Sequence, residues 1–180
     1  IAKNYCVTIA GIDQQILNEN EVYNLIIAKG TLTKEERKII NGHMDITVEM
    51  LESMEFPKHL ARVPEYACGH HEKMDGTGYP KGLTRAQMSK PARMMAIADV
   101  FEALTACDRP YKSAKTLLET LTIMGWMRVD NHLDPELFDV FIDQKVYQPF
   151  ADKFLLDFQK EEFDLSKIPG YVLPELRKKK

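Results

Sequence analysis

Residues 70–82 read HHEKMDGTGYPKG, a polar stretch between two segments with helical patterning. The part from 75 to 82 holds three glycines and one proline in eight residues, which predicts a structured loop. The preceding segment opens with Pro64, a residue that suits the first position of a helix. His70 and His71 are therefore expected at the end of a short helix, immediately before the loop.

A long helix is predicted upstream of this stretch. Thr33 and Glu36 have the spacing of a capping box, in which the hydroxyl serves the third amide and the carboxylate reaches back. Pro57 marks the end of the helix. A stripe of side chains at helical spacing is expected to face the core: Ile39, Ile40, His43, Thr47, Met50, Leu51 and Met54. His43 is therefore predicted to point inward.

A further helix is predicted downstream of the loop, with Ser89 as its cap and Pro91 in its first turn. Its buried face is expected to hold Met94, Ile97, Phe101 and Leu104. Asp99 falls on another face, where small side chains would let a neighbouring backbone approach, in line with Ala92, Met95, Ala103 and Ala106. A carboxylate buried there is costly unless an arginine, a lysine or a metal ion neutralises it.

Helical patterning continues toward the C-terminal end and predicts an all-α fold. A helix is expected over about 116–128, and another is opened by Asp134 as its cap. No run of alternating apolar and polar residues calls for a sheet. We therefore expect a linker or insertion at 1–32, a helical core at 33–160 and an extended tail at 161–180.

The composition restricts the class of protein. The chain has 180 residues, 44% of them hydrophobic and 28% charged, which is typical of one soluble globular domain. A net charge of −3 disfavours a polymeric nucleic acid partner. No stretch approaches the roughly 18 consecutive apolar residues of a membrane span. The three cysteines lack close metal-type spacing and suggest reduced thiols, which favours a cytoplasmic protein.

Three histidines and one aspartate are the candidate metal ligands. A lone inward histidine such as His43 is more often a core residue with satisfied nitrogens, so its partners must decide its role. Together with His70, His71 and Asp99, it would give mixed nitrogen and oxygen ligands, which favour iron, manganese, zinc or nickel over calcium. Adjacent histidines on a helix diverge by about 100°, so the pair is expected to serve two neighbouring metals. Phosphodiester hydrolysis favours such multi-metal centres.

Residues 70–80 resemble the HHExxDGxGYP signature of the HD-GYP family, and every fixed position of that signature matches. Five further segments resemble the same family in order and spacing: 30–33, 41–43, 96–105, 108–112 and 132–136. The resemblance covers about residues 21–145 and implies an HD-domain-like helical bundle. It implies a phosphodiesterase that hydrolyses cyclic di-GMP to the linear dinucleotide pGpG, to GMP, or to both.

The resemblance also implies the residues of the site. His43, His70, His71 and Asp99 match the family's metal ligands, which hold two or three divalent ions, most often iron or manganese. Water activated by these ions replaces a side-chain nucleophile. The positions of Arg109 and Lys112 match family residues that approach the phosphates and bases of the substrate, where cationic donors are needed.

The loop residues receive weaker assignments. Tyr79 is expected to shape the mouth of the site. Glu72 is expected either to act directly or to orient a neighbouring histidine, and Asp75 either to act directly or to cap the loop. The loop from Gly78 to Pro80 is also implicated by the resemblance in contacts with diguanylate cyclase (GGDEF) domains.

The chain departs from the family pattern at its N-terminal end. The His-Asp pair that gives the family its name is absent, and residues 1–32 contain no histidine. Either those ligands lie before Ile1, beside a sensory or receiver domain, or this copy is a degenerate module that binds cyclic di-GMP or a cyclase without turnover. The bundle is therefore expected to be incomplete at its N-terminus. Hydrolysis of cyclic GMP-AMP stays open as a third function.

Overall fold

The structure of the chain is a computed structural model that describes residues 6–9, 12–15, 19–26, 32–107 and 114–177. It divides into two compact units, residues 1–43 and residues 44–180. None of the helices within the described ranges is both long enough and apolar enough to cross a lipid bilayer.

The first unit contains a hairpin that the sequence did not predict. Strands β1 (Cys6–Ile9) and β2 (Ile12–Gln15) pair antiparallel, with Val7 opposite Gln14. Each strand has only four residues, which is too short for alternation to stand out from the surrounding sequence. Helices α1 (Glu19–Leu25) and α2 (Lys34–Asn41) follow. The prediction that the chain contains no sheet was therefore wrong in this unit.

The predicted capping box begins α2 as expected. The Glu36 amide donates to the Thr33 hydroxyl at 3.1 Å, and the Thr33 amide donates to the Glu36 carboxylate at 2.8 Å. The single long helix, however, is interrupted at Gly42, after which α3 (His43–Glu52) begins.

The predicted inward stripe is largely exposed. Ile39 and Met50 are 76% and 58% exposed, and His43 also lies at the surface. The buried side chain of α3 is Met44, which belongs to a neighbouring face of the helix. His43 is the last residue of the first unit, so whether it faces the second unit stays a prediction.

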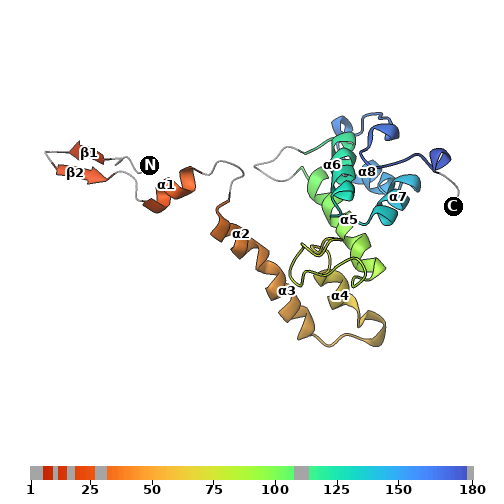
Figure 1. The fold of residues 1–180 in the computed structure, drawn as a ribbon, viewed down its shortest axis with the longest axis horizontal. Helices are drawn as coiled ribbons and strands as arrows, with labels where there is room; N and C mark the ends of the chain where they lie inside the picture. The colour runs from red at the N-terminus through yellow and green to blue at the C-terminus, as the bar shows by residue number, and fades with distance from the viewer. Residues whose placement is uncertain (1–5, 10–11, 16–18, 27–31, 108–113, 178–180) are drawn as a thin grey trace. The chain divides into compact units, whose positions relative to one another are not determined.

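The second unit is helical, and its central element is α5 (Lys90–Thr105). It packs against α4 (Val63–Cys68), α6 (Leu117–Val129) and α7 (Pro135–Asp143), as Figure 1 shows. Helix α8 (Gln148–Phe154) follows, and short 3₁₀ turns cover Lys58–Leu60, Asp157–Gln159, Leu165–Lys167 and Pro174–Leu176. The predicted all-α class is confirmed for this unit.

Local caps explain where several helices begin. Asp134 accepts hydrogen bonds from the amides of Glu136 and Leu137 at 3.0 and 3.1 Å, which confirms its predicted role at α7. Thr116 forms a capping box with Glu119 at α6. Ser89 occupies the cap position of α5, but its hydroxyl does not bond to the helix.

The core lies among α5, α6, α7 and the segment after α8. Phe101 and Ile97 are buried as predicted, but Met94 is 57% exposed. The most completely buried apolar side chains come from α6, the turn after it and α7: Leu121, Met124, Leu133, Phe138 and Ile142. Burial of such a side chain stabilises the fold by roughly 1.5–3 kcal/mol. Residues expected in an extended tail also join this core, because Ile168 and Tyr171 are buried in it.

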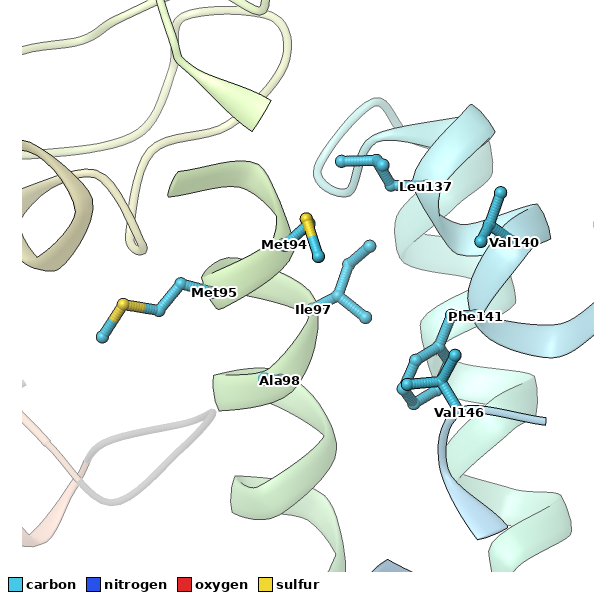
Figure 2. A pocket seen from close by; sticks show the side chains of 8 residues that line it. All are labelled: Met94, Met95, Ile97, Ala98, Leu137, Val140, Phe141 and Val146. Atoms are coloured by element: carbon cyan, nitrogen blue, oxygen red, sulfur yellow. The ribbon is translucent and has the colours of Figure 1, made fainter. Parts of the chain in front are cut away.

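An apolar groove of about 340 Å³ lies between α5 and α7 (Figure 2). Its walls are Met94, Met95, Ile97, Ala98, Leu137, Val140, Phe141 and Val146. None of these side chains can ligate a metal through nitrogen or carboxylate oxygen, so the groove is not the candidate catalytic site.

Candidate metal centre

The turn after α4 brings two histidines to the face of α5. Helix α4 ends at Cys68, and Gly69, His70 and His71 follow in a turn. A Cβ atom at residue 69 would lie 2.9 Å from the Cβ of Ala92, so a glycine is required for this close approach. Ala92 lies two helical turns before Asp99 on α5. The predicted approach of another backbone to the Asp99 face is thus confirmed.

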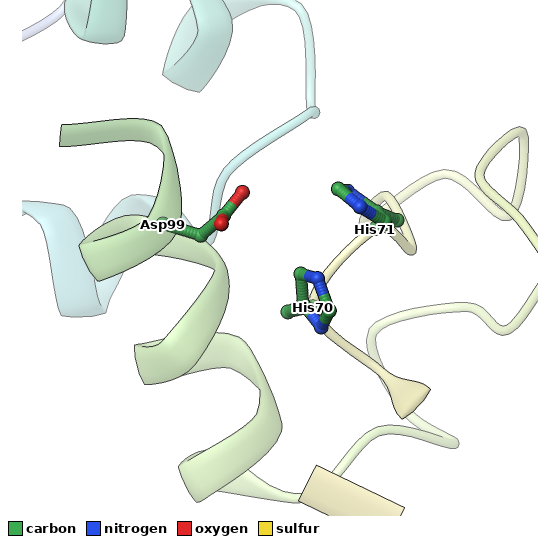
Figure 3. A group of neighbouring side chains, drawn as sticks. All are labelled: His70, His71 and Asp99. Atoms are coloured by element: carbon green, nitrogen blue, oxygen red, sulfur yellow. The ribbon is translucent and has the colours of Figure 1, made fainter. Parts of the chain in front are cut away.

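His70, His71 and Asp99 form a group with convergent ligand atoms. One nitrogen of each ring and one carboxylate oxygen all lie within 4.8 Å of one another, and each side chain is partly buried. Figure 3 shows both rings on the turn facing the Asp99 carboxylate on α5. Ligand atoms around one transition-metal ion are roughly 3–4 Å apart, given bonds of about 2.0–2.2 Å. The donor set and its spacing therefore fit a metal ion.

The two histidines are closer together than the sequence argument allowed. Their ring centroids are 4.1 Å apart. The expected divergence of about 100° applies to neighbours on a helix, whereas these residues lie in a turn. One ion could accordingly contact both rings, which the sequence analysis had considered unfavourable.

Backbone carbonyls set the proton position on two of the predicted ligands. Nδ1 of His70 contacts the carbonyl oxygen of Ala67, and Nδ1 of His43 contacts that of Ile40. A carbonyl can only accept, so each Nδ1 carries a proton, and in the neutral form of either ring Nε2 carries the lone pair. This is the tautomer that a metal-binding imidazole needs.

Tyr79 lies against His71. Their rings stack with centroids 4.9 Å apart and planes inclined by 22°, and the Tyr79 amide donates to the His71 carbonyl at 3.3 Å. The tyrosine is therefore adjacent to the candidate centre, and its role at the mouth of the site stays a prediction.

The two acidic residues of the loop bind backbone amides. Glu72 is buried and accepts from the amides of Lys81 and Leu83. Asp75 is exposed and accepts from the amide and the hydroxyl of Thr77, and the amide bond above all lowers the pKa of Asp75. Asp75 thus caps the loop, one of the two roles considered for it.

Gly78 and Pro80 shape the same loop. A Cβ at residue 78 would lie 2.4 Å from the amide nitrogen of Lys73, so a larger residue cannot fit without moving the backbone. Pro80 is partly buried and follows a cis peptide bond.

Three predicted site residues stay untested. His43 belongs to the first unit, whereas the group of His70, His71 and Asp99 belongs to the second. Its membership of the same centre therefore remains a prediction. Arg109 and Lys112 lie outside the described residues.

An ionic network that no local sequence pattern indicated connects the loop to α7. Asp134 is fully buried and accepts from Arg85 Nε at 2.9 Å and from Arg93. Burial alone would raise the pKa of Asp134, but hydrogen bonds from Arg85, the Leu137 amide and Arg93 lower it. Because the Arg85 amide also donates to the Met74 carbonyl at 3.1 Å, the network ties the loop to α7. The 49 positions between Arg85 and Asp134 leave no local signal of this contact.

Comparisons with known proteins agree with this picture. A family model described as HD domain matches residues 18–137. The chain is 46% identical over 88 residues to a 3'3'-cGAMP-specific phosphodiesterase of Vibrio cholerae, covering 48% of this chain and 20% of the relative. It is 38% identical over 114 residues to a cyclic di-GMP phosphodiesterase of Pseudomonas aeruginosa, covering 63% of this chain and 26% of the relative.

A third relative is matched over a longer stretch. The chain is 37% identical over 141 residues to a cyclic di-GMP phosphodiesterase of Thermotoga maritima, covering 78% of this chain and 34% of the relative. The matched parts thus span about a fifth to a third of the length of these three relatives.

Proposed function

Because the chain belongs to the HD domain family, in line with its HD-GYP resemblance, we propose that it forms the metal-binding part of a cyclic di-GMP phosphodiesterase. The products would be pGpG, GMP or both. The observation that carries the proposal is the convergence of His70, His71 and Asp99 within 4.8 Å. The names of its relatives, which act on cyclic di-GMP or 3'3'-cGAMP, support the substrate class.

The proposed metal ligands are His43, His70, His71 and Asp99. Their nitrogen and oxygen donors suit two or three divalent ions, with iron or manganese as the preferred metals. When bound, such ions activate water and withdraw charge from a phosphodiester, so the protein needs no side-chain nucleophile.

The side chains of the protein supply the binding geometry. The Asp99 carboxylate would offset the positive charge of the bound ions. The Ala67 carbonyl contacts Nδ1 of His70 and so favours the tautomer in which Nε2 can bind a metal. Tyr79 covers one face of His71 and limits the direction from which a dinucleotide can approach. Arg109 and Lys112 are proposed to donate hydrogen bonds to the substrate phosphates.

The proposal extends to partners and location. The loop from Gly78 to Pro80 would contact diguanylate cyclase (GGDEF) domains, and an upstream sensory or receiver domain would control the site. The free thiols of Cys68 and Cys107 suit the reducing cytoplasm, where we place the protein.

Two other functions each have an observation in their favour. The Vibrio relative acts on 3'3'-cGAMP, which favours a mixed cyclic dinucleotide as substrate. The absence of a His-Asp dipeptide in the chain favours a non-catalytic module that binds cyclic di-GMP or a cyclase.

A single assay separates these functions. The full-length natural protein, loaded with Mn²⁺ or Fe²⁺ in the absence of oxygen, is incubated with cyclic di-GMP or with 3'3'-cGAMP, and products are separated by chromatography. We expect cyclic di-GMP to be cleaved to pGpG or GMP. Preferred cleavage of 3'3'-cGAMP would reassign the substrate, and binding without cleavage of either would support the non-catalytic module.

A further inference from the structure

Glu72 is a buried acid directly beside a proposed ligand. Its side chain is 1% exposed, and its two carboxylate oxygens accept from the Lys81 amide at 2.7 Å and the Leu83 amide at 2.8 Å. Burying a carboxylate is costly unless it is hydrogen-bonded, and amide bonds to an ionised acceptor are among the stronger ones. Both oxygens of the carboxylate are therefore hydrogen-bonded to the C-terminal end of the loop, at Lys81 and Leu83.

The bonds from Glu72 close the loop on itself. They join residue 72 to residues 81 and 83, so the intervening segment must turn back across Glu72. Gly78 lies in this return path, where a Cβ would come within 2.5 Å of the Glu72 Cα. The loop thus wraps tightly around residue 72, and the segment that contains Gly78 packs against the Glu72 backbone.

The same segment contacts the candidate centre through the next residue. Tyr79 follows Gly78, donates its amide to the His71 carbonyl at 3.3 Å and stacks its ring on the His71 imidazole. The Tyr79 ring therefore lies on the loop that the hydrogen bonds of Glu72 close. A continuous path of contacts runs from the Glu72 carboxylate through the loop backbone to the His71 ring.

We propose that Glu72 is a positioning residue that holds Tyr79 against His71 and thereby orients the His71 imidazole for its metal. The inference rests on the proposed function only in taking His71 as a ligand. It assigns Glu72 a role through the loop, distinct from direct ligation and from loop stability alone. Residues that orient a metal ligand from outside typically contribute about 10–100-fold to metal affinity.

The first test is Glu72→Gln in the full-length protein. The amide group of glutamine places a donor where Lys81 or Leu83 also donates, so one hydrogen bond is lost with little change in shape. We expect the affinity for Co²⁺, followed by its absorbance, to fall about tenfold, with the number of bound ions at saturation unchanged. A lower number of bound ions would identify Glu72 as a ligand and overturn the proposal.

A second readout needs no metal. In the metal-free protein, the ring protons of His71, assigned with His71→Gln, are shifted by the stacked Tyr79 ring, and Tyr79→Leu removes this shift. We expect Glu72→Gln to move the His71 resonance toward its Tyr79→Leu position. If Glu72→Gln leaves both the His71 resonance and the Co²⁺ affinity unchanged, the proposal is overturned and Glu72 has only a structural role. This holds even if the variant unfolds at a lower temperature.

Two further variants serve as a stability control and as an independent test of the Tyr79–His71 contact. Asp143→Asn removes another partly buried carboxylate of the second unit, which accepts from Tyr171 and Arg177, and should lower thermal stability while leaving the Co²⁺ affinity unchanged. Tyr79→Leu tests the final contact even if Glu72→Gln does not fold, because wild-type Co²⁺ affinity in that variant would also overturn the proposal. Neither readout uses turnover, so a wild-type protein that binds Co²⁺ but cleaves no cyclic dinucleotide counts only against the proposed function.

Discussion

The loop at residues 70–83 combines an apolar cluster that includes Met74 and Leu83 with hydrogen bonds to a buried carboxylate, whereas the core around α6 and α7 is predominantly apolar. The loop closes through hydrogen bonds to the buried Glu72 carboxylate, whereas the core consists of apolar side chains such as Leu121 and Phe138 with no exposed surface. The two regions meet on α5, which buries Phe101 in the core and presents Asp99 to the histidines. This difference predicts that substitutions can disrupt the chemistry and the stability of the protein separately.

The largest expected effect is on the chemistry alone. His71→Ala or Asp99→Ala in the full-length protein removes one proposed ligand, and should lower bound metal and abolish hydrolysis together. Elemental analysis and product chromatography measure the two quantities. Glu161→Gln, which changes an exposed acid far along the chain, serves as the control. Full activity with retained metal in both ligand variants would remove the site assignment.

The next effect should fall on the core alone. Phe138→Ala leaves a cavity at a fully buried position and should lower the free energy of unfolding by about 3–5 kcal/mol, measured with urea. Val140→Ala, on the same helix but 50% exposed, should cost far less. Because the substitution changes none of the proposed metal ligands, the Phe138→Ala variant should bind metal normally at a low temperature where it is still folded. Loss of metal from the folded variant would show that the two regions are not separable.

A smaller effect is expected where α5 leaves the core. Gln159 is 1% exposed and donates through Nε2 to the carbonyls of Thr105 and Lys115, at 3.0 and 2.9 Å. Gln159→Leu has similar volume but leaves these acceptors unsatisfied, and should lower the free energy of unfolding by about 1–3 kcal/mol. Gln148→Leu, which breaks an exposed hydrogen bond to Asp152, is the comparison. Equal unfolding midpoints in urea for the two variants would contradict this role for Gln159.

The smallest effect concerns pH and the network that ties the loop to α7. The pKa of Asp134 is lower in the folded protein than its ordinary value. Its contribution to stability is therefore fully present above the unfolded pKa of about 3.9 and is lost as the pH falls through the folded pKa. Urea unfolding of wild type and Asp134→Asn between pH 6 and pH 3 should show a stability difference that shrinks toward acid. A constant difference would argue against an ionised Asp134.

Local sequence signals predicted the helix starts but not the partners of polar groups. Thr33 with Glu36 and the cap at Asp134 were correct because each involves residues within three positions. The hairpin at Cys6–Gln15 escaped prediction because its strands are too short for a period to emerge. Ile39, Met50 and Met54 of the predicted stripe are exposed, because helical spacing identifies a common face without identifying what covers it.

Local sequence patterns specify the helical character of the larger unit, the loop after His71 and the nitrogen and oxygen atoms that could bind a metal. These depend on turn residues, caps and side-chain chemistry, which act over a few positions. The packing of separate segments, by contrast, brings His70 and His71 together in a turn facing Asp99 and lets Glu72 accept hydrogen bonds from Lys81 and Leu83. Such convergence depends on how separate segments pack in space, and the spacing of residues along a chain does not encode those distances.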